Sequence, residues 1–555
     1  MVTKKFIFNF WPFFLLLLFT TLIAWPIFLP GYFSHHDDLQ VMRIFEMKKC
    51  IDDWQIPCRW VPDLGFGNGY PLFNYYNVFP YYIGAIGSYF LGFIGSAKLL
   101  FFMAVTLAGV SMYLLAEELF GTYPALLAAT LYMFAPYRAL DIYVRGAVAE
   151  SFSLAIIPLV LYFAFKLTKK DLPRFKIGLA LSFAAFLTSH NIMTLLFLPV
   201  ISAFFLIWFW KREFTIVKSL ILYLLLGFGL SAFFIVPAFL EKNLVQIDNL
   251  VRLELDFRGH FVTLYQLFLD RGWGYGASFP GVGDTISFQI GWPHWFLALG
   301  SIVSWFFVKK RDYKWLILYC ATLLIFAGSI FMTHIRSAFI WEQIGILRFT
   351  QFPWRFLSIV IFSSSLLGGF FVYNLKESVA KIVTVILIIV TVFLNWNYFK
   401  PQQFIFDLTD KEKLSGKLWE TQQKAAILDY LPIQSVEPLE PAPPKPIIVK
   451  GDAEIKNFEN KSNRWQFEAN VFDSSVVEVP VFDFPDWQVF VNGKKIDHSN
   501  KNYLGRISFN LSRGDYFVVG KFENTLIRTI ANIISAISIL VIIFILYGKI
   551  RKTDN

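Results

Sequence analysis

Charge is scarce in this sequence, and cysteine is scarcer still. Asp, Glu, Lys and Arg make up 16% of the residues, against 56% for the hydrophobic types, and the mean hydropathy is +0.53. A chain this apolar falls outside the ordinary soluble proteins. Three cysteines among 555 residues also exclude a fold held together by a disulfide framework.

Long apolar runs are the dominant feature. A helix of roughly 17 to 25 residues crosses the ~30 Å hydrocarbon core of a bilayer. About twelve such runs can be read, so we expect a mainly α-helical, polytopic membrane protein. They lie at 6–29, 98–116, 122–137, 150–168, 174–189, 191–210, 216–240, 293–308, 315–332, 354–373, 379–398 and 526–547.

Basic residues gather in alternate loops between these runs. Because Lys and Arg accumulate on the cytoplasmic side of a membrane, the pattern predicts that both termini are cytoplasmic. The first run has no small-residue cleavage site, so we expect it to stay as an anchor in the plasma membrane. The basic residues that set this orientation are Lys4, Lys5, Lys166, Lys169, Lys170, Arg174, Lys176, Lys211, Arg212, Lys218, Lys309, Lys310, Arg311, Lys314, Lys549, Arg551 and Lys552.

The chain divides into six segments under this topology. Alternating apolar residues near its end, broken by Asn492-Gly493 and Arg513-Gly514, predict a small external β-sandwich with tight hairpins. Five prolines from Pro438 to Pro446 predict a semi-rigid linker before it. The expected segments are a transmembrane anchor (1–29), an external loop (30–97), a multi-span domain (98–398), a linker (399–446), an external β-domain (447–525) and a last helix with a cytoplasmic tail (526–555).

Two adjacent carboxylates, Asp37 and Asp38, follow the first span at the expected membrane surface. Because a carboxylate is costly to desolvate beside hydrocarbon, the pair points to chemistry, metal binding or the binding of a polar ligand. Between Leu39 and Trp54 the apolar residues recur at spacings of three and four, which predicts an amphipathic helix. This helix either lies along the membrane interface and holds the pair at headgroup level, or is an ordinary connector.

A glycine-rich stretch, with Gly65, Gly67 and Gly69, comes later in the same loop. No strand signal precedes it and no Lys-Ser/Thr follows, so we do not expect a nucleotide-binding loop. The glycines permit tight turns, and the aromatic residues around them, such as Tyr70, either cover a sugar-like ligand or form an interfacial belt.

The cysteines Cys50 and Cys58 share this loop. In an oxidising compartment they can form a disulfide, but small buried cysteines are common, and both outcomes stay open.

Further polar residues stand at the external ends of other spans. Arg145 follows the third span, His190 lies in a tight external turn, and Arg348, Gln351 and Arg355 precede the tenth span. A guanidinium binds phosphate with two hydrogen bonds and stays ionised when half-buried, so these arginines are candidates for binding a lipid-linked phosphate. Each arginine could instead snorkel or pair with an acid, and His190 could be an ordinary satisfied polar residue.

Taken together, these motifs resemble the GT-C class of integral membrane glycosyltransferases. More narrowly, they resemble bacterial membrane proteins labelled 6-pyruvoyl-tetrahydropterin synthase-related, although nothing here resembles a soluble pterin enzyme with zinc-binding histidines. The tail is similar to the external domain of YfhO-like membrane proteins, which are implicated in glycosylating teichoic acid. The segments that carry these resemblances are His36-Asp37-Asp38 with Arg43, Arg59-Trp60, 67–73, 351–355, and 482–487 with Asn492-Gly493.

The resemblance implies a GT-C-like fold and a transferase reaction. A sugar would move from a polyprenyl-phosphate lipid to a glycan or protein acceptor of the cell envelope, on the external face, with no nucleic acid involved. Asp37 and Asp38 are the expected catalytic residues, and a divalent cation, Mg or Mn, would be held by them and His36 if one is used. The expected substrate-binding residues are His36, Arg43, Arg59, Tyr70, Arg145, His190, Arg348, Gln351 and Arg355.

Two other functions stay open. The same charged residues could line the pathway of a transporter or flippase for lipid-linked glycans, or the chain could be a non-catalytic envelope scaffold. Charges gather at the external ends of the spans and not at their middles, which favours the enzyme over the transporter.

Overall fold

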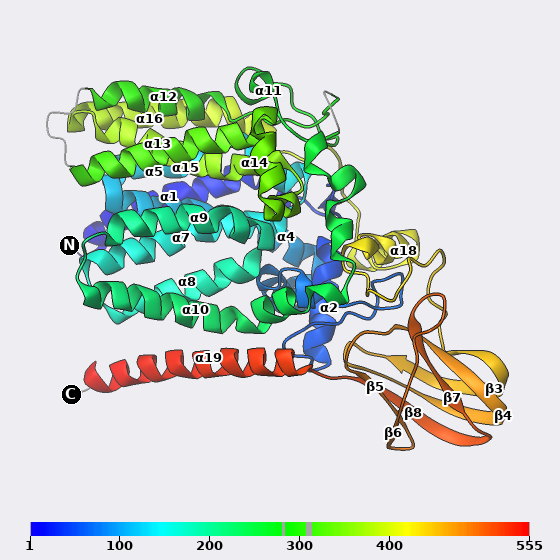
Figure 1. Ribbon diagram of the computed structural model, residues 1–555. Coiled ribbons are helices and arrows are strands. Elements are labelled where there is room, and N and C mark those ends of the chain that lie inside the picture. The colour runs from blue at the N-terminus through cyan, green and yellow to red at the C-terminus, as the bar shows by residue number, and fades with distance from the viewer. Residues whose placement is uncertain (1, 280–282, 307–312, 554–555) are drawn as a thin grey trace.

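The chain folds into a helical membrane bundle with a β-domain at one end (Figure 1). The computed structural model describes residues 2–279, 283–306 and 313–553. Among these residues, eight helices are long and apolar enough to cross a membrane. They are α4 (Phe79–Phe120), α7 (Val148–Lys169), α9 (Asn191–Phe209), α10 (Phe214–Leu240), α13 (Tyr313–Thr333), α15 (Leu357–Tyr373), α16 (Glu377–Asn395) and α19 (Leu526–Thr553).

Helices also occupy the positions of the other four expected spans. For example, α5 has 12 residues and is followed closely by Pro136. A helix of this length is shorter than a full membrane span. A helix therefore lies at each of the about twelve expected positions, and eight of these helices are long and apolar enough to be candidate membrane spans. The other four helices are α1 (Val2–Ile23, with an apolar part from Phe10 to Ile23), α5 (Thr122–Met133), α8 (Pro173–Ser189) and α12 (Trp292–Trp305).

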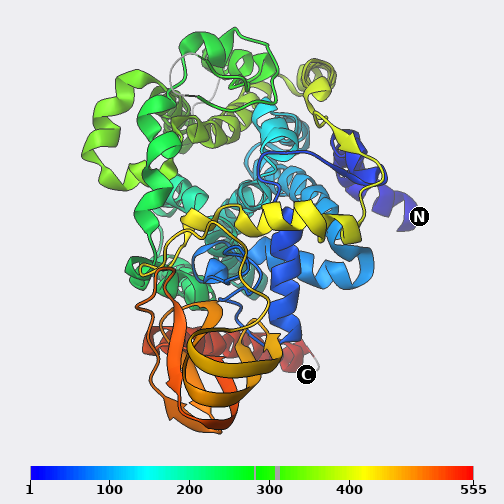
Figure 2. The ribbon, with the colours of Figure 1, turned by 90° about the vertical axis from the view of Figure 1, so that its right-hand side faces the viewer.

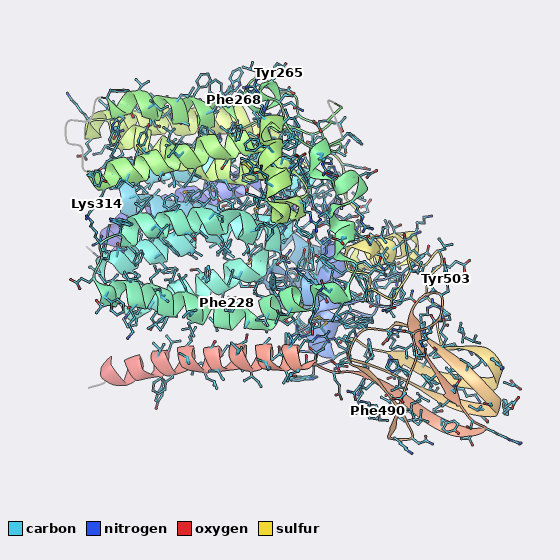
Figure 3. The ribbon with its side chains drawn as sticks, in the orientation of Figure 1. Phe228, Tyr265, Phe268, Lys314, Phe490 and Tyr503 are labelled. Carbon is cyan, nitrogen blue, oxygen red and sulfur yellow. A yellow bond between two sulfur atoms is a disulfide. The ribbon has the colours of Figure 1, made fainter. Side chains whose placement is uncertain are left out.

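The two ends of the bundle differ. Both chain termini lie at one end, while the β-domain and α2 (Gln40–Asp52) lie at the other (Figure 1). Exposed aromatic residues such as Phe228 and Tyr265 lie on the outer surface of the bundle (Figure 3), where a lipid-facing helix would place them. The orientation inferred from basic residues stays a prediction, and three of those residues, Lys309, Lys310 and Arg311, lie outside the described residues.

The expected amphipathic helix is α2. It crosses the ends of the bundle helices instead of running parallel to them (Figures 1 and 2). Its buried face holds Val41, Ile44 and Met47, in the predicted spacing. A disulfide joins Cys50, in the last turns of α2, to Cys58 in the loop that follows.

Short helices join the main elements at the same end of the bundle. Two of them, α17 (Asp410–Lys413) and α18 (Gly416–Lys424), cross over the bundle within the segment expected to be a linker (Figure 2). The Asp410 carboxylate accepts hydrogen bonds from the backbone N–H groups of Phe93 and Ile94, at 2.7 and 2.8 Å, where α4 bends at Gly92. The other short helices are α3 (Leu72–Tyr75), α6 (Pro136–Ala139), α11 (Leu264–Phe268) and α14 (Ala338–Gln343).

The β-domain is a six-stranded antiparallel sheet of order β3-β4-β8-β5-β6, with β7 also paired to β4. The first half of β4 pairs with β8 and the second half with β7, so the sheet bends and encloses rings from both halves, including Trp465 and Phe509. Asn492-Gly493 forms the predicted hairpin turn, whereas Arg513-Gly514 joins two strands that pair with β4 and not with each other. The strands are β3 (Ile447–Asn460), β4 (Arg464–Phe482), β5 (Trp487–Val491), β6 (Lys494–Ile496), β7 (Arg506–Leu511) and β8 (Gly514–Phe522), and a separate pair joins β1 (Tyr32–Phe33) to β2 (Phe404–Ile405).

The glycine-rich stretch is where the β-domain docks. Gly69 has a φ of +69°, and a Cβ there would lie 2.7 Å from the Trp60 indole nitrogen, so only glycine allows this approach. The indole of Trp60 is fully buried and packs edge-on against Trp487. Asn68 accepts a hydrogen bond from the Arg506 Nε at 2.7 Å. Trp60 and Asn68 therefore connect the first external loop to the β-domain.

Candidate active site

A cavity of about 570 Å³ opens at the β-domain end of the bundle. Its walls come from the loop before α2, the segments leading into α7 and α9, the residues before α15, and the chain just after α18. Seven of the eleven residues predicted for the site line it: His36, Asp37, Arg43, Arg145, His190, Gln351 and Arg355.

The backbone fixes the position of Asp37. The N–H groups of His36 and Asp37 donate to the carbonyl oxygens of Val144 and Arg145, at 2.9 and 3.0 Å. Gly146, with a φ of +69°, lets the two segments meet, because a Cβ there would lie 2.3 Å from the ring of His35. These contacts place Asp37 beside the Arg145 segment, more than a hundred residues away in sequence.

The side chain of Asp37 is bound through one oxygen. Its Oδ2 accepts hydrogen bonds from Arg43, at 2.6 Å, and from Gln40, at 3.0 Å. Its Oδ1 has no hydrogen-bond partner among the described residues, and the side chain is 35% exposed. The carboxylate is thus oriented by a charge on one side and free to reach a ligand on the other.

Another part of the cavity wall carries two arginines around a buried glutamate. Arg145 donates to Glu150 at 2.8 Å and also pairs with Asp141. Burial alone would lower the pKa of Arg145, but the charges of Glu150 and Asp141 raise it above its ordinary value. The Tyr137 hydroxyl donates to the other oxygen of Glu150 at 2.6 Å. Arg145 therefore stays ionised at any physiological pH.

Arg355 is the second arginine of this wall. Its Nη1 donates to the Thr350 carbonyl and to Gln351 Oε1, both at 2.8 Å. Its Nε lies 3.8 Å from Glu150 and makes no hydrogen bond within the described chain, although it is buried. Gln351 itself has a φ of +65°, a strained conformation for a residue with a side chain. The Nε of Arg355 therefore stays beside Glu150 and is not open to the cavity.

His190 completes the same wall at the start of α9. Burial, together with the charges of Arg355 and Arg145, lowers its pKa to about 3. Its Nδ1 accepts the N–H of Met193 at 3.1 Å, which leaves Nε2 as the protonated nitrogen. His190 is therefore a neutral hydrogen-bond donor beside the cavity. We refer to Arg145, His190 and Arg355 as the arginine wall.

The other acid of the pair, Asp38, does not line the cavity. It forms an ion pair with Lys413, and His35 lies 3.9 Å from its other oxygen. Asp37 and Asp38 are therefore neutralised by different cations, Arg43 and Lys413, and do not converge. No three His, Cys, Asp or Glu side chains come together as metal ligands within the described ranges. Because the expected ligand set does not fit a cation, we derive no step through one.

Three further predicted residues also lie elsewhere. Arg59 is buried and donates to Asn74 at 3.0 Å and to Asn532 of α19 at 2.8 Å, so it links the first external loop to the last helix. Tyr70 is buried, pairs through its backbone with Val61, and does not line the cavity, although its phenol feels the charge of Asp429. Arg348 is half-exposed and lies 3.6 Å from Asp248.

Two cavity residues, Asp429 and Tyr430, were not expected from the sequence. Both follow α18, in the segment expected to be a linker. In the sequence they are one acidic residue next to one aromatic residue, which is not a recognisable binding or catalytic motif. Their role depends on long-range contacts that place this segment over the cavity.

Comparison with known proteins gives distant likenesses of fold. No model of a known protein family matches the chain, and no curated protein matches its sequence, so the resemblance to the 6-pyruvoyl-tetrahydropterin synthase-related and YfhO-like families stays a prediction. Among solved structures, the arabinofuranosyltransferase AftD from Mycobacteria is similar at a TM-score of 0.46 and 14% identity, over 72% of this chain and 27% of that one.

Two more solved structures show a weaker likeness. ArnT from Cupriavidus metallidurans, bound to undecaprenyl phosphate, gives a TM-score of 0.38 at 12% identity, over 67% of this chain and 61% of that one. The oligosaccharyltransferase AglB from Archaeoglobus fulgidus, in complex with an inhibitory peptide and a dolichol-phosphate, gives 0.38 at 14% identity, over 71% and 56%. The chain spans less than two thirds of each of these proteins, so its function has to be argued from its own cavity.

Proposed function

We propose that this protein is a membrane glycosyltransferase that moves a sugar from a polyprenyl-phosphate donor to an acceptor of the cell envelope. The observation that carries the proposal is that an acid and two arginines line one cavity. Asp37 keeps one carboxylate oxygen without a partner among the described residues, and Arg145, His190 and Arg355 line the same cavity. A base and an anion-binding group facing a shared space are what transfer from a phosphate leaving group requires.

The reaction can be written with these residues. The oxygen of an acceptor hydroxyl forms a bond to the anomeric carbon of the donor sugar, while the bond from that carbon to the phosphate oxygen breaks. The hydroxyl proton passes to Asp37, and the electron pair of the broken bond leaves with the lipid phosphate. Arg145, Arg355 and neutral His190 stabilise the added negative charge on that phosphate.

The remaining cavity wall suits an amphiphilic donor. Ala238, Ile247, Leu250 and Leu255 line it beside the charged groups. A prenyl chain needs an apolar path from the bilayer to the site of reaction, whereas a soluble sugar nucleotide does not. The apolar lining therefore supports a lipid-linked donor.

The external face is the proposed side of the reaction. The cavity and the β-domain lie at the end of the bundle opposite both termini (Figure 1). If the basic loops are cytoplasmic, as their composition indicates, the cavity opens to the outside of the cell.

Turnover of defined donors tests the proposal. The full chain, reconstituted in liposomes, would be given a panel of radiolabelled polyprenyl-phosphate sugars with cell-envelope fractions as acceptors. We expect release of sugar from at least one donor and its appearance in an acceptor. Tight binding of the lipids without any turnover would contradict the proposal and would make transport of lipid-linked glycans the better account.

A further inference from the structure

Two acidic residues that line the cavity, Glu254 and Asp429, have no role in the proposed reaction, and of the two Asp429 is the more buried. It lies at the end of the short 3-10 helix Ile427–Asp429, between α18 and the β-domain. Its carboxyl group makes no hydrogen bond to any residue that the structure describes, and it faces the cavity. A half-buried carboxyl group without a protein partner keeps its oxygens open to water or to a ligand in the cavity.

The charges around Asp429 place it on the Asp37 side of the cavity. Burial raises its pKa to about 6, with Asp37 adding to the shift and Arg43 opposing it. The neighbouring titratable groups that feel its charge are the phenols of Tyr70 and Tyr430. Asp429 therefore lies close enough to Asp37 and Arg43 to feel their charges.

The segment that carries Asp429 is held rigidly. The ring of Tyr430 stacks on Tyr75 at 5.6 Å, and the Tyr75 hydroxyl donates to the Glu241 carbonyl at 2.7 Å. Just beyond, the N–H of Gln246 donates to the Leu431 carbonyl at 2.9 Å. A side chain mounted in this way is positioned before a ligand arrives.

The backbone beside Asp429 is also strained. Ala426, which lines the cavity, has a φ of +56°, a conformation that is unfavourable for a residue with a Cβ. Gln351, on another wall of the same cavity, has a φ of +65°. Strain of this kind persists where the surrounding structure imposes it, and it concentrates at ligand-binding sites.

We propose that Asp429 binds the hydroxyl groups of the acceptor sugar and holds the reacting hydroxyl against Asp37. This inference rests on the proposed function and names the substrate class of one side of the cavity. A carboxylate repels the phosphate of the donor, so a place near Asp429 suits the uncharged acceptor. The two oxygens of a carboxylate can accept hydrogen bonds from adjacent hydroxyl groups of a sugar, and both oxygens of Asp429 lack a partner among the described residues.

The role of Asp429 is tested by the ratio of sugar transferred to an acceptor to sugar released to water. The reconstituted full chain would receive a radiolabelled polyprenyl-phosphate sugar with a panel of methyl glycosides and envelope glycans as acceptors. Sugar transferred and sugar released to water would both be measured. In Asp429→Asn we expect the ratio of transfer to hydrolysis to fall about ten-fold or more, through a higher KM for the acceptor, because a charged hydrogen bond is lost.

Two further variants separate binding from folding. Asp429→Glu should restore part of the ratio. Glu420→Gln, which changes an exposed carboxylate of α18 outside the cavity, should leave the ratio unchanged. Binding of undecaprenyl phosphate should be equal in all four proteins, because the arginine wall is intact.

Each other outcome has a defined meaning. If wild type is active and Asp429→Asn keeps the wild-type ratio, or loses transfer and hydrolysis equally, the role of Asp429 is wrong and the proposed function stands. If wild type releases sugar but transfers it to no acceptor sugar, the role of Asp429 is also wrong. If wild type binds the lipid and releases nothing, the proposed function itself fails, and this inference fails with it.

Discussion

Replacing Glu150 by glutamine should destabilise the protein and strengthen its binding of a lipid phosphate. Glu150 is fully buried, accepts hydrogen bonds from Arg145 and Tyr137, and lies 3.8 Å from Arg355. Glutamine has the same shape and no charge, so the variant leaves Arg355 without a carboxylate near it. Removing one partner from a buried ion pair costs about 3–5 kcal/mol.

We place the loss at about 3 kcal/mol, the lower end of that range, because Asp141 still pairs with Arg145. The assay is reversible unfolding in mixed micelles of dodecyl maltoside and SDS. Glu118→Gln is the matched control: Glu118 also binds two cations, Lys166 and Lys169, but the three side chains are 20–45% exposed. Exposed pairs contribute about 0–1 kcal/mol, so this variant should unfold nearly as wild type does.

Undecaprenyl phosphate should compensate for the missing charge. A phosphate that enters beside Arg355 no longer meets the repulsion of Glu150, so we expect Glu150→Gln to bind the lipid about ten-fold more tightly, or by about 1.4 kcal/mol. The lipid should therefore stabilise the variant more than it stabilises wild type. Equal stability of Glu150→Gln and wild type, or lipid binding that weakens in the variant, would refute the assignment of the arginine wall as the phosphate site.

Three further predictions follow from single contacts. His190→Gln, which keeps a neutral donor, should retain most of the turnover that His190→Ala loses, and neither effect should vary between about pH 5 and pH 8, because the pKa of His190 is lowered to about 3. Trp60→Ala should release the β-domain at a cost of about 3–5 kcal/mol, seen as new proteolysis in the 438–446 segment, whereas Trp54→Ala, at an 85% exposed residue, should not. The ratio of transfer to hydrolysis should rise as the pH increases from about 5 to about 7, because the pKa of Asp429 is raised to about 6 and its ionised form accepts the hydrogen bonds. In Asp429→Asn the ratio should be independent of pH.

Sequence patterns were sufficient where the structure is local. Apolar runs gave the positions of the helices, the three-and-four spacing after Leu39 gave α2, and Asn492-Gly493 gave the β5–β6 turn. Each of these signals acts within one element, because helix periodicity and turn geometry depend on near neighbours. The same holds for the polar residues at the ends of the spans, since both Arg145 and Arg355 line the cavity.

Contacts between distant segments could not be predicted in this way. Asp37 and Asp38 are adjacent, yet one binds Arg43 within the cavity and the other binds Lys413 of α17, and no local pattern separates them. In the sequence Arg59 resembles a ligand-binding arginine, but in the structure its guanidinium already donates hydrogen bonds to Asn74 and Asn532. The chain around Asp429 reads as a linker, because its folded state depends on tertiary contacts such as that between Gln246 and Leu431.

The most direct test of the central claim compares the two adjacent acids in one turnover assay. With a donor that the wild type uses, Asp37→Asn should lower the rate of sugar release about 10²- to 10⁴-fold, because the general base is lost. Asp38→Asn, which changes the neighbour that lies outside the cavity, should keep most of the rate if the protein remains folded. Equal rates for wild type and a folded Asp37→Asn would contradict the account.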